Sequence, residues 1–84
     1  MNIYVLKSCD AWKTYNSMKD IVYTTNLKTL KKVIVEELKQ DNMEYDGDFS
    51  SDFDKFINDE DLVRYIDIRL TYGHLICVED GEIL

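Results

Sequence analysis

The sequence contains no proline, only three glycines, two cysteines and one histidine. Without proline-rich or glycine-rich stretches there is no sign of a flexible linker, so we expect one domain over residues 1–84. Two cysteines are too few for a disulfide scaffold or a cysteine-rich zinc site. Cys9 and Cys77 are therefore expected to be reduced thiols, with a single bridge between them as the alternative.

The chain also lacks the motifs that accompany catalysis and cofactor binding. It has no glycine-rich phosphate loop, no G-x-S-x-G elbow and no His-x-x-x-His pair. Calcium-loop frames that begin at Asn42 or Asp48 both fail, because Phe53 falls where the loop needs Glu or Gly. We expect no enzyme, no cofactor and no metal site. The remaining catalytic alternative pairs Cys9 with His74.

Long apolar runs are absent as well, and none approaches the roughly 20 residues that a membrane span needs. The N-terminal residues do not resemble a signal peptide. Ten basic and seventeen acidic residues give a net charge of −7, which opposes binding to nucleic acid or to an anionic membrane. The composition predicts a soluble acidic protein of the cytoplasm, with no membrane contact and no direct contact with nucleic acid.

What the sequence does contain is a clear pattern of short elements. Residues 3–7 and 20–25 are rich in β-branched and aromatic types and predict strands. Residues 27–40 carry apolar side chains at helical spacing after Asn26 or Thr25, either of which suits the N-cap. This helix is expected to bury the apolar stripe Leu27, Leu30, Val33, Ile34 and Leu38.

The second half predicts shorter elements. Residues 43–49 read as an edge strand or a turn around Gly47, and Ser50 or Ser51 as the cap of a helical turn with Phe53, Phe56 and Ile57 on one side. A helix is expected over 59–72 with Gly73 as a left-handed C-cap, followed by a strand over 74–78. Asp80-Gly81 predicts a turn before a short returning strand at Ile83-Leu84.

This order predicts an α+β fold: a small, mainly antiparallel sheet of three or four strands, covered by two amphipathic helices. Across the helices, Leu30 and Ile34 are expected to pack with Ile66 and Leu70.

Negative charge is concentrated in residues 41–61, which hold nine acidic residues and one lysine. One interpretation is a solvated acidic surface. The other is that the carboxylates imitate nucleic-acid phosphates and occupy the basic groove of a nucleic-acid-binding protein. The candidate protein-binding residues are Asp46, Asp48, Asp52, Asp54, Asp59, Glu60 and Asp61.

The polar segment 8–19 is long for a connection between two strands, and long ordered loops are often functional. It combines aromatic stacking surfaces with hydroxyls and lysines, the chemistry that a nucleotide-sized ligand or a protein hot spot requires. The candidate ligand-binding residues are Ser8, Trp12, Lys13, Tyr15, Ser17 and Lys19. The alternative is that Trp12 caps the small core.

Two segments carry a resemblance to a group of proteins. Residues 4–18 (YVLKSCDAWKTYNSM) resemble the start of small uncharacterised proteins encoded by bacteriophages and prophages. Residues 69–75 (RLTYGHL) and 79–83 (EDGEI) are similar to their C-terminal part. By analogy of size and charge, the resemblance implies an anti-defence factor, either an anti-CRISPR-like inhibitor or a sponge for nucleotide immune signals.

The sequence-based hypothesis is a non-enzymatic, phage-type binding protein that counteracts host defence in the bacterial cytoplasm. Its first form captures a small anionic, nucleotide-like signal through loop 8–19. Its alternative form inhibits a host nucleic-acid-binding defence protein through the carboxylates of residues 41–61. A pocket is hard to form within one small core, so we expect a homo-oligomer whose interface supplies part of the wall.

Overall fold

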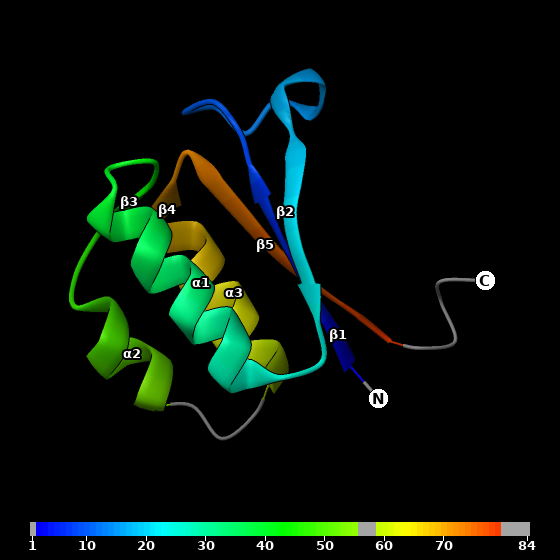
Figure 1. Ribbon diagram of the computed structural model, residues 1–84, viewed down its shortest axis with the longest axis vertical. Coiled ribbons are helices and arrows are strands. Elements are labelled where there is room, and N and C mark those ends of the chain that lie inside the picture. The colour runs from blue at the N-terminus through cyan, green and yellow to red at the C-terminus, as the bar shows by residue number, and fades with distance from the viewer. Residues whose placement is uncertain (1, 56–58, 80–84) are drawn as a thin grey trace.

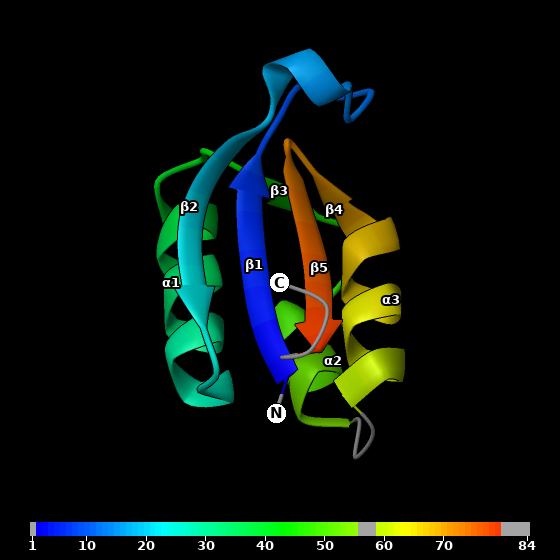
Figure 2. The same cartoon turned by 90° about the vertical axis from the view of Figure 1, so that its right-hand side faces the viewer.

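The central strand of the fold is β1 (Asn2–Ser8), which pairs antiparallel with β2 (Lys19–Thr24) on one side and with β5 (Gly73–Glu79) on the other. The computed structural model describes residues 2–55 and 59–79, and for Asp59, Glu60 and Glu79 it describes the backbone alone. The helices all lie on one side of the sheet, and no described helix or strand covers the other side, which is called the open face below (Figures 1 and 2). The α+β class expected from the sequence is confirmed.

The register of the three strands decides which side chains face the helices. Val5 lies opposite Tyr23 on β2 and Ile76 on β5, whereas Leu6 lies opposite Val22 and Leu75. Because successive side chains of a strand point to opposite faces, Leu6 is directed into the core and Val5 to the open face. The register shifts between Leu6 and Lys7, and the pairing then continues with Lys7 opposite Asp20 and Ser8 opposite Lys19, where the loop begins.

Helix α1 (Leu27–Lys39) forms as its sequence pattern predicts. Asn26 is its N-cap, and the Asn26 side-chain oxygen accepts hydrogen bonds from the backbone N–H groups of Lys28 at 2.8 Å and Thr29 at 3.3 Å. Leu30 and Ile34 are fully buried against the sheet. The helix therefore begins and ends within one residue of the expected bounds.

The acidic half of the chain forms more structure than two helices. A two-residue strand β3 (Glu44–Tyr45) pairs with β4 (Leu70–Thr71) in a second sheet. Helix α2 (Phe49–Lys55) follows β3 in the chain and contacts α1 and α3 (Asp59–Arg69). Asp48, rather than Ser50 or Ser51, caps α2, because its carboxylate accepts from Ser51 N–H at 3.3 Å. Phe49 and Phe53 of α2 complete the core.

The expected end of the last helix is wrong. The helix stops at Arg69 because residues 70 and 71 pair with β3 instead of continuing the helical turn. The left-handed residue is Tyr72, with φ 67°, and Gly73 begins β5. The small size of glycine nevertheless matters at position 73, because an added Cβ would lie 2.5 Å from Met43 Sδ and would displace this side chain.

The buried apolar side chains, apart from Val5, form one cluster that draws on the sheet and all three helices. Leu30, Ile34, Ile66 and Leu70 all belong to it, although Leu70 lies on β4 and not on the last helix, where it was expected. The predicted positions of Phe56 and Ile57, of the Asp80-Gly81 turn and of a strand at Ile83-Leu84 fall outside the described residues. Among residues 2–55 and 59–79, no helix combines the length and apolar character needed to cross a membrane.

Candidate functional site

The loop between β1 and β2 projects beyond the ends of the strands (Figure 1) and is held in shape by Asp10. The Asp10 carboxylate accepts from the backbone N–H groups of Trp12 at 3.1 Å and Thr14 at 3.0 Å, and from the Thr14 hydroxyl at 2.7 Å. These bonds, led by those from Thr14, lower the pKa of Asp10 below its ordinary value of 3.8. One carboxylate thus organises five residues of the loop.

The braced loop presents its two large aromatic side chains to solvent. Trp12 is 84% exposed and Tyr15, on the 3-10 turn η1 (Tyr15–Ser17), is 88% exposed. Trp12 therefore does not cap the core, and that interpretation of the sequence is wrong. Tryptophan and tyrosine are enriched among the residues that carry the binding energy of protein interfaces, so this pair is a candidate contact surface.

Lys13 joins the loop to the body of the protein. Its Nζ lies 3.1 Å from Asp67 Oδ1 on α3 and also donates to the Asp67 backbone carbonyl. The same Asp67 oxygen accepts from Leu75 N–H at 2.9 Å and lies 2.9 Å from His74 Nδ1. Lys13 has a φ of 54°, a left-handed conformation that a non-glycine residue adopts only when its surroundings hold it there.

The other candidate ligand-binding residues lie at the base of the loop. Ser17 Oγ donates to the Thr14 carbonyl at 2.8 Å and accepts from Asp10 N–H at 3.0 Å. Ser8 and Lys19 face each other at the ends of β1 and β2, and the Lys19 side chain is exposed. Of the six candidates, Trp12, Tyr15 and Lys19 are directed to solvent, whereas Lys13 and Ser17 stabilise the loop itself.

The Cys9–His74 alternative gains no support from the geometry. Burial raises the pKa of the Cys9 thiol, which leaves less of the reactive thiolate at neutral pH. Nδ1 of the His74 ring contacts the Asp67 carboxylate and not a cysteine. Neither Cys9 nor Cys77 takes part in a disulfide.

The candidate carboxylates of the acidic stretch do not all point to solvent as one array. Asp52 accepts from the Tyr45 hydroxyl at 2.7 Å, and Asp54 pairs with Lys31 of α1 at 2.9 Å. Burial and the Asp52 contact raise the pKa of Tyr45 well above its usual range, so its hydroxyl stays protonated as the donor. These two aspartates link α2 to β3 and α1, and each has a lysine beside it, because Lys55 Nζ lies 3.7 Å from Asp52 Oδ1.

Asp46, Asp48 and Asp61 are exposed, and Asp48 also caps α2. The side chains of Asp59 and Glu60 lie outside the described residues. Within the described part of the chain, no group of three or more His, Cys, Asp or Glu side chains is arranged to hold a metal ion.

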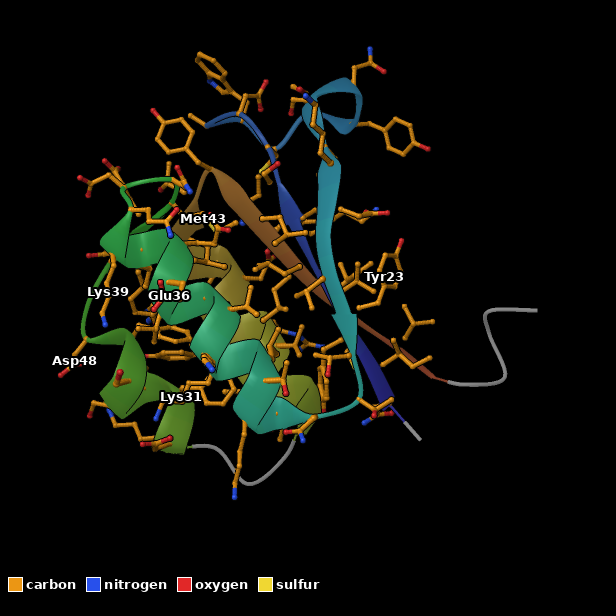
Figure 3. The ribbon with its side chains drawn as sticks, viewed as in Figure 1. Tyr23, Lys31, Glu36, Lys39, Met43 and Asp48 are labelled. Carbon is orange, nitrogen blue, oxygen red and sulfur yellow. The ribbon has the colours of Figure 1, made fainter. Side chains whose placement is uncertain are left out.

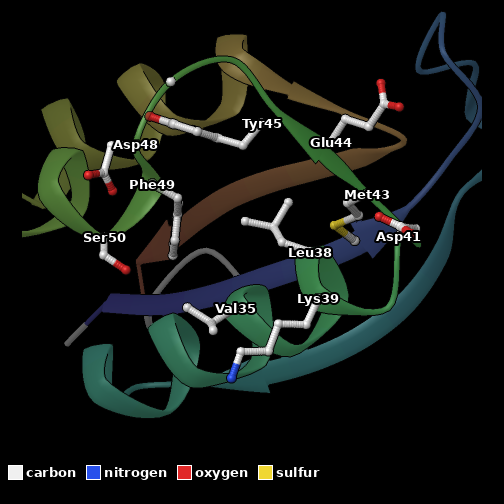
Figure 4. Close-up of a pocket in the computed structure, with 11 residues that line it drawn as sticks. Val35, Leu38, Lys39, Asp41, Met43, Glu44, Tyr45, Asp48, Phe49 and Ser50 are labelled. Carbon is white, nitrogen blue, oxygen red and sulfur yellow. The ribbon is translucent and has the colours of Figure 1, made fainter.

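A groove of about 810 Å³ lies between α1 and the segment that carries β3 (Figure 4). Its apolar lining comes from Val35 and Leu38 on one side and from Tyr45 and Phe49 on the other. The charged residues around it are Lys39, Asp41, Glu44 and Asp48. Sequence reasoning missed this groove, because its two walls are separate in sequence and only the core packing brings them together.

Comparison of the chain with protein-family models, curated proteins and solved structures finds no match. Functional inference therefore rests on the chain's own geometry.

Proposed function

We propose that this chain is a non-enzymatic binding protein whose principal contact surface is the aromatic loop 8–19. Its partner is a protein of a bacterial defence system, the role implied by the resemblance to phage-encoded proteins. The observation that carries the proposal is the exposure of Trp12 and Tyr15 on a loop that Asp10 and Lys13 hold rigid. Tryptophan and tyrosine are the side chains that most often supply the binding energy of protein interfaces.

The rigidity of the loop supports this function. A contact surface that is ordered before binding loses less conformational entropy when the complex forms. The Asp10 bonds and the Lys13–Asp67 contact fix the backbone on both sides of Trp12. The loop therefore presents its aromatic side chains in a defined arrangement instead of ordering them on contact.

A protein partner accounts for the geometry better than a small anion does. Three loop side chains that would contact a phosphate, Lys13, Thr14 and Ser17, already bond to Asp67, Asp10 and the loop backbone. The groove between α1 and β3 is not lined by any residue of 8–19. The exposed aromatic faces and Lys19 would also suit a nucleotide-like signal. Capture of such a signal is therefore a separate outcome of the test.

The groove between α1 and β3 favours a second candidate function. Its apolar floor and the three carboxylates of Asp41, Glu44 and Asp48 suit a segment with one apolar face and several basic residues. Such segments are frequent in nucleic-acid-binding proteins. In this form the acidic half of the chain inhibits its target by occupying a basic segment.

The test uses affinity capture from a bacterial lysate that contains the defence proteins, with quantification of each retained protein. Four forms are compared: the unchanged chain, Trp12→Ala with Tyr15→Ala, Asp41→Asn with Asp48→Asn, and Ile68→Ala. The two aspartates belong to the groove. Ile68 is the matched control, because it is an exposed apolar residue on α3 and not on the loop. Small molecules released by denaturing each sample are identified by mass spectrometry.

If the loop is the contact surface, the aromatic double variant weakens capture of a specific protein by about 30-fold or more, a typical effect for removing a hot spot. The aspartate and Ile68 variants retain capture. Loss in the aspartate variant alone, with steep weakening by salt, supports the second candidate instead. If a nucleotide is released from the unchanged chain but not from the aromatic variant, the partner of the loop is a small ligand and not a protein.

A further inference from the structure

The open face of the main sheet is apolar, and no helix or strand among residues 2–55 and 59–79 covers it (Figure 2). An antiparallel sheet with one solvated face ordinarily alternates apolar and polar residues. Here β1 and β5 contain uninterrupted apolar runs, Ile3–Leu6 and Leu75–Val78. Such runs are typical of strands that are buried on both faces.

A hollow of about 410 Å³ marks the centre of this face. It is lined by Ile3 and Val5 of β1, Ile76 and Val78 of β5, the aromatic ring of Tyr23 and the stem of Lys7. Tyr23 points away from the helices (Figure 3) and is 61% exposed. The face thus combines a shallow apolar depression with a protruding aromatic side chain beside it.

The charges on this face balance locally, unlike those of the whole chain. Lys7 pairs with Asp20 at 3.2 Å, and His74 lies opposite Lys7 on β5. β3 and α2, which carry much of the acidic stretch, lie on the far side of the molecule (Figure 1). Two copies that meet through their open faces would keep two sheets and two helical layers between these acidic regions.

This arrangement limits the repulsion between two chains of charge −7. A single helix is about 10 Å across, and the Debye length at physiological salt is about 8 Å. The acidic regions of two such copies are therefore screened from each other. Contact through the helical side would bring them together instead.

The shape of the face also suits a second copy. Two open sheet faces can stack about 10 Å apart, with the side chains of their inner surfaces interdigitated, as in β-sandwich folds.

We propose that a second copy of this chain packs on the open sheet face and forms a two-fold symmetric dimer. The two sheets stack face to face, and Tyr23 of each copy contacts the hollow of the other. The dimer leaves the aromatic loop and the acidic groove of both copies accessible, and it is independent of the function proposed for the loop.

The test is sedimentation of the full chain over a range of micromolar concentrations. Tyr23→Glu and Val78→Glu place a charge on the open face, whereas Ile68→Glu places the same charge on the exposed surface of α3 as the matched control. We expect the unchanged chain and Ile68→Glu to form dimers, and each open-face variant to raise the dimer dissociation constant at least tenfold. Circular dichroism verifies that each variant is folded.

If the chain is a monomer throughout the concentration range, the proposal is overturned. The occupant of the face would then be another partner or residues 80–84 of the same chain. A dimer that is unchanged by Tyr23→Glu also overturns the proposal. If Val78→Glu fails to fold, Tyr23→Glu alone serves as the test. Because the contact is apolar and separates like charges, added salt is expected to leave the dimer intact or strengthen it. Dissociation by salt would assign the contact to another surface.

Discussion

Lys13 and Asp67 are 54 residues apart in sequence, yet the Lys13 ammonium lies 3.1 Å from the Asp67 carboxylate. The contact fastens the aromatic loop to α3. The Asp67 carboxylate also accepts a hydrogen bond from Leu75 N–H and lies beside His74. The loop, the last helix and the start of β5 therefore meet at one carboxylate.

Replacing Lys13 with Met tests this attachment. The variant keeps the length of the side chain but loses both contacts to Asp67, and we expect a loss of about 1 kcal/mol in the free energy of unfolding. The loop should also become more mobile, which amide relaxation of residues 10–17 measures by NMR. Lys32→Met on the exposed side of α1 is the control. Unchanged relaxation in the Lys13 variant would contradict the role of this contact.

Acidification is expected to loosen the loop through Asp10. Hydrogen bonds from Thr14 keep the Asp10 pKa below its ordinary value of 3.8, so the folded state favours the carboxylate. The resulting stabilisation is present above pH 3.8 and is lost as the pH falls through the lower pKa of the folded state. The amide signals of Trp12 and Thr14 should follow this transition in an NMR titration.

Asp10→Asn provides the control for that titration. It should abolish the transition of the Trp12 and Thr14 amides, whereas Asp20→Asn, outside the loop, should retain it. A transition that persists in Asp10→Asn would assign it to another group.

The contact between Gly73 and Met43 predicts a non-additive pair of substitutions. In Gly73→Ala the new Cβ meets the buried Met43 side chain at 2.5 Å, so we expect a loss of about 1–3 kcal/mol from overpacking. Shortening Met43 to Ala removes the obstacle while leaving a cavity. The double variant should therefore be more stable than the sum of the single effects, measured by urea unfolding. Additive effects would show that the two residues do not compete for space.

Ile34 tests the core beneath α1. The side chain is fully buried, and truncation to Ala should lower the free energy of unfolding by about 2–4 kcal/mol, a large part of the stability of a domain this small. Ile68→Ala removes the same atoms from an exposed position and should change the stability by less than about 0.5 kcal/mol. Equal effects in the two variants would contradict the docking of α1 on the sheet.

The sequence alone determined the elements whose signals are local. Asn26 and the apolar stripe that follows it predicted α1, because a cap and a helical period act within a few residues of each other. The β-branched runs predicted β1, β2 and β5 for the same reason. The acidic stretch and the aromatic loop were likewise visible in composition.

Tertiary structure decided the features that depend on distant partners. Helix α3 ends at Arg69 because residues 70 and 71 pair with β3, a competition between sheet and helix that the local pattern does not contain. Lys13 is bound to Asp67, and Trp12 is left in solvent, through the packing of the loop against α3. The apolar runs of β1 and β5 were present in the sequence, but only the placement of all three helices on one side revealed that their second face is open. These outcomes follow from contacts between segments far apart in the chain, which no local preference specifies.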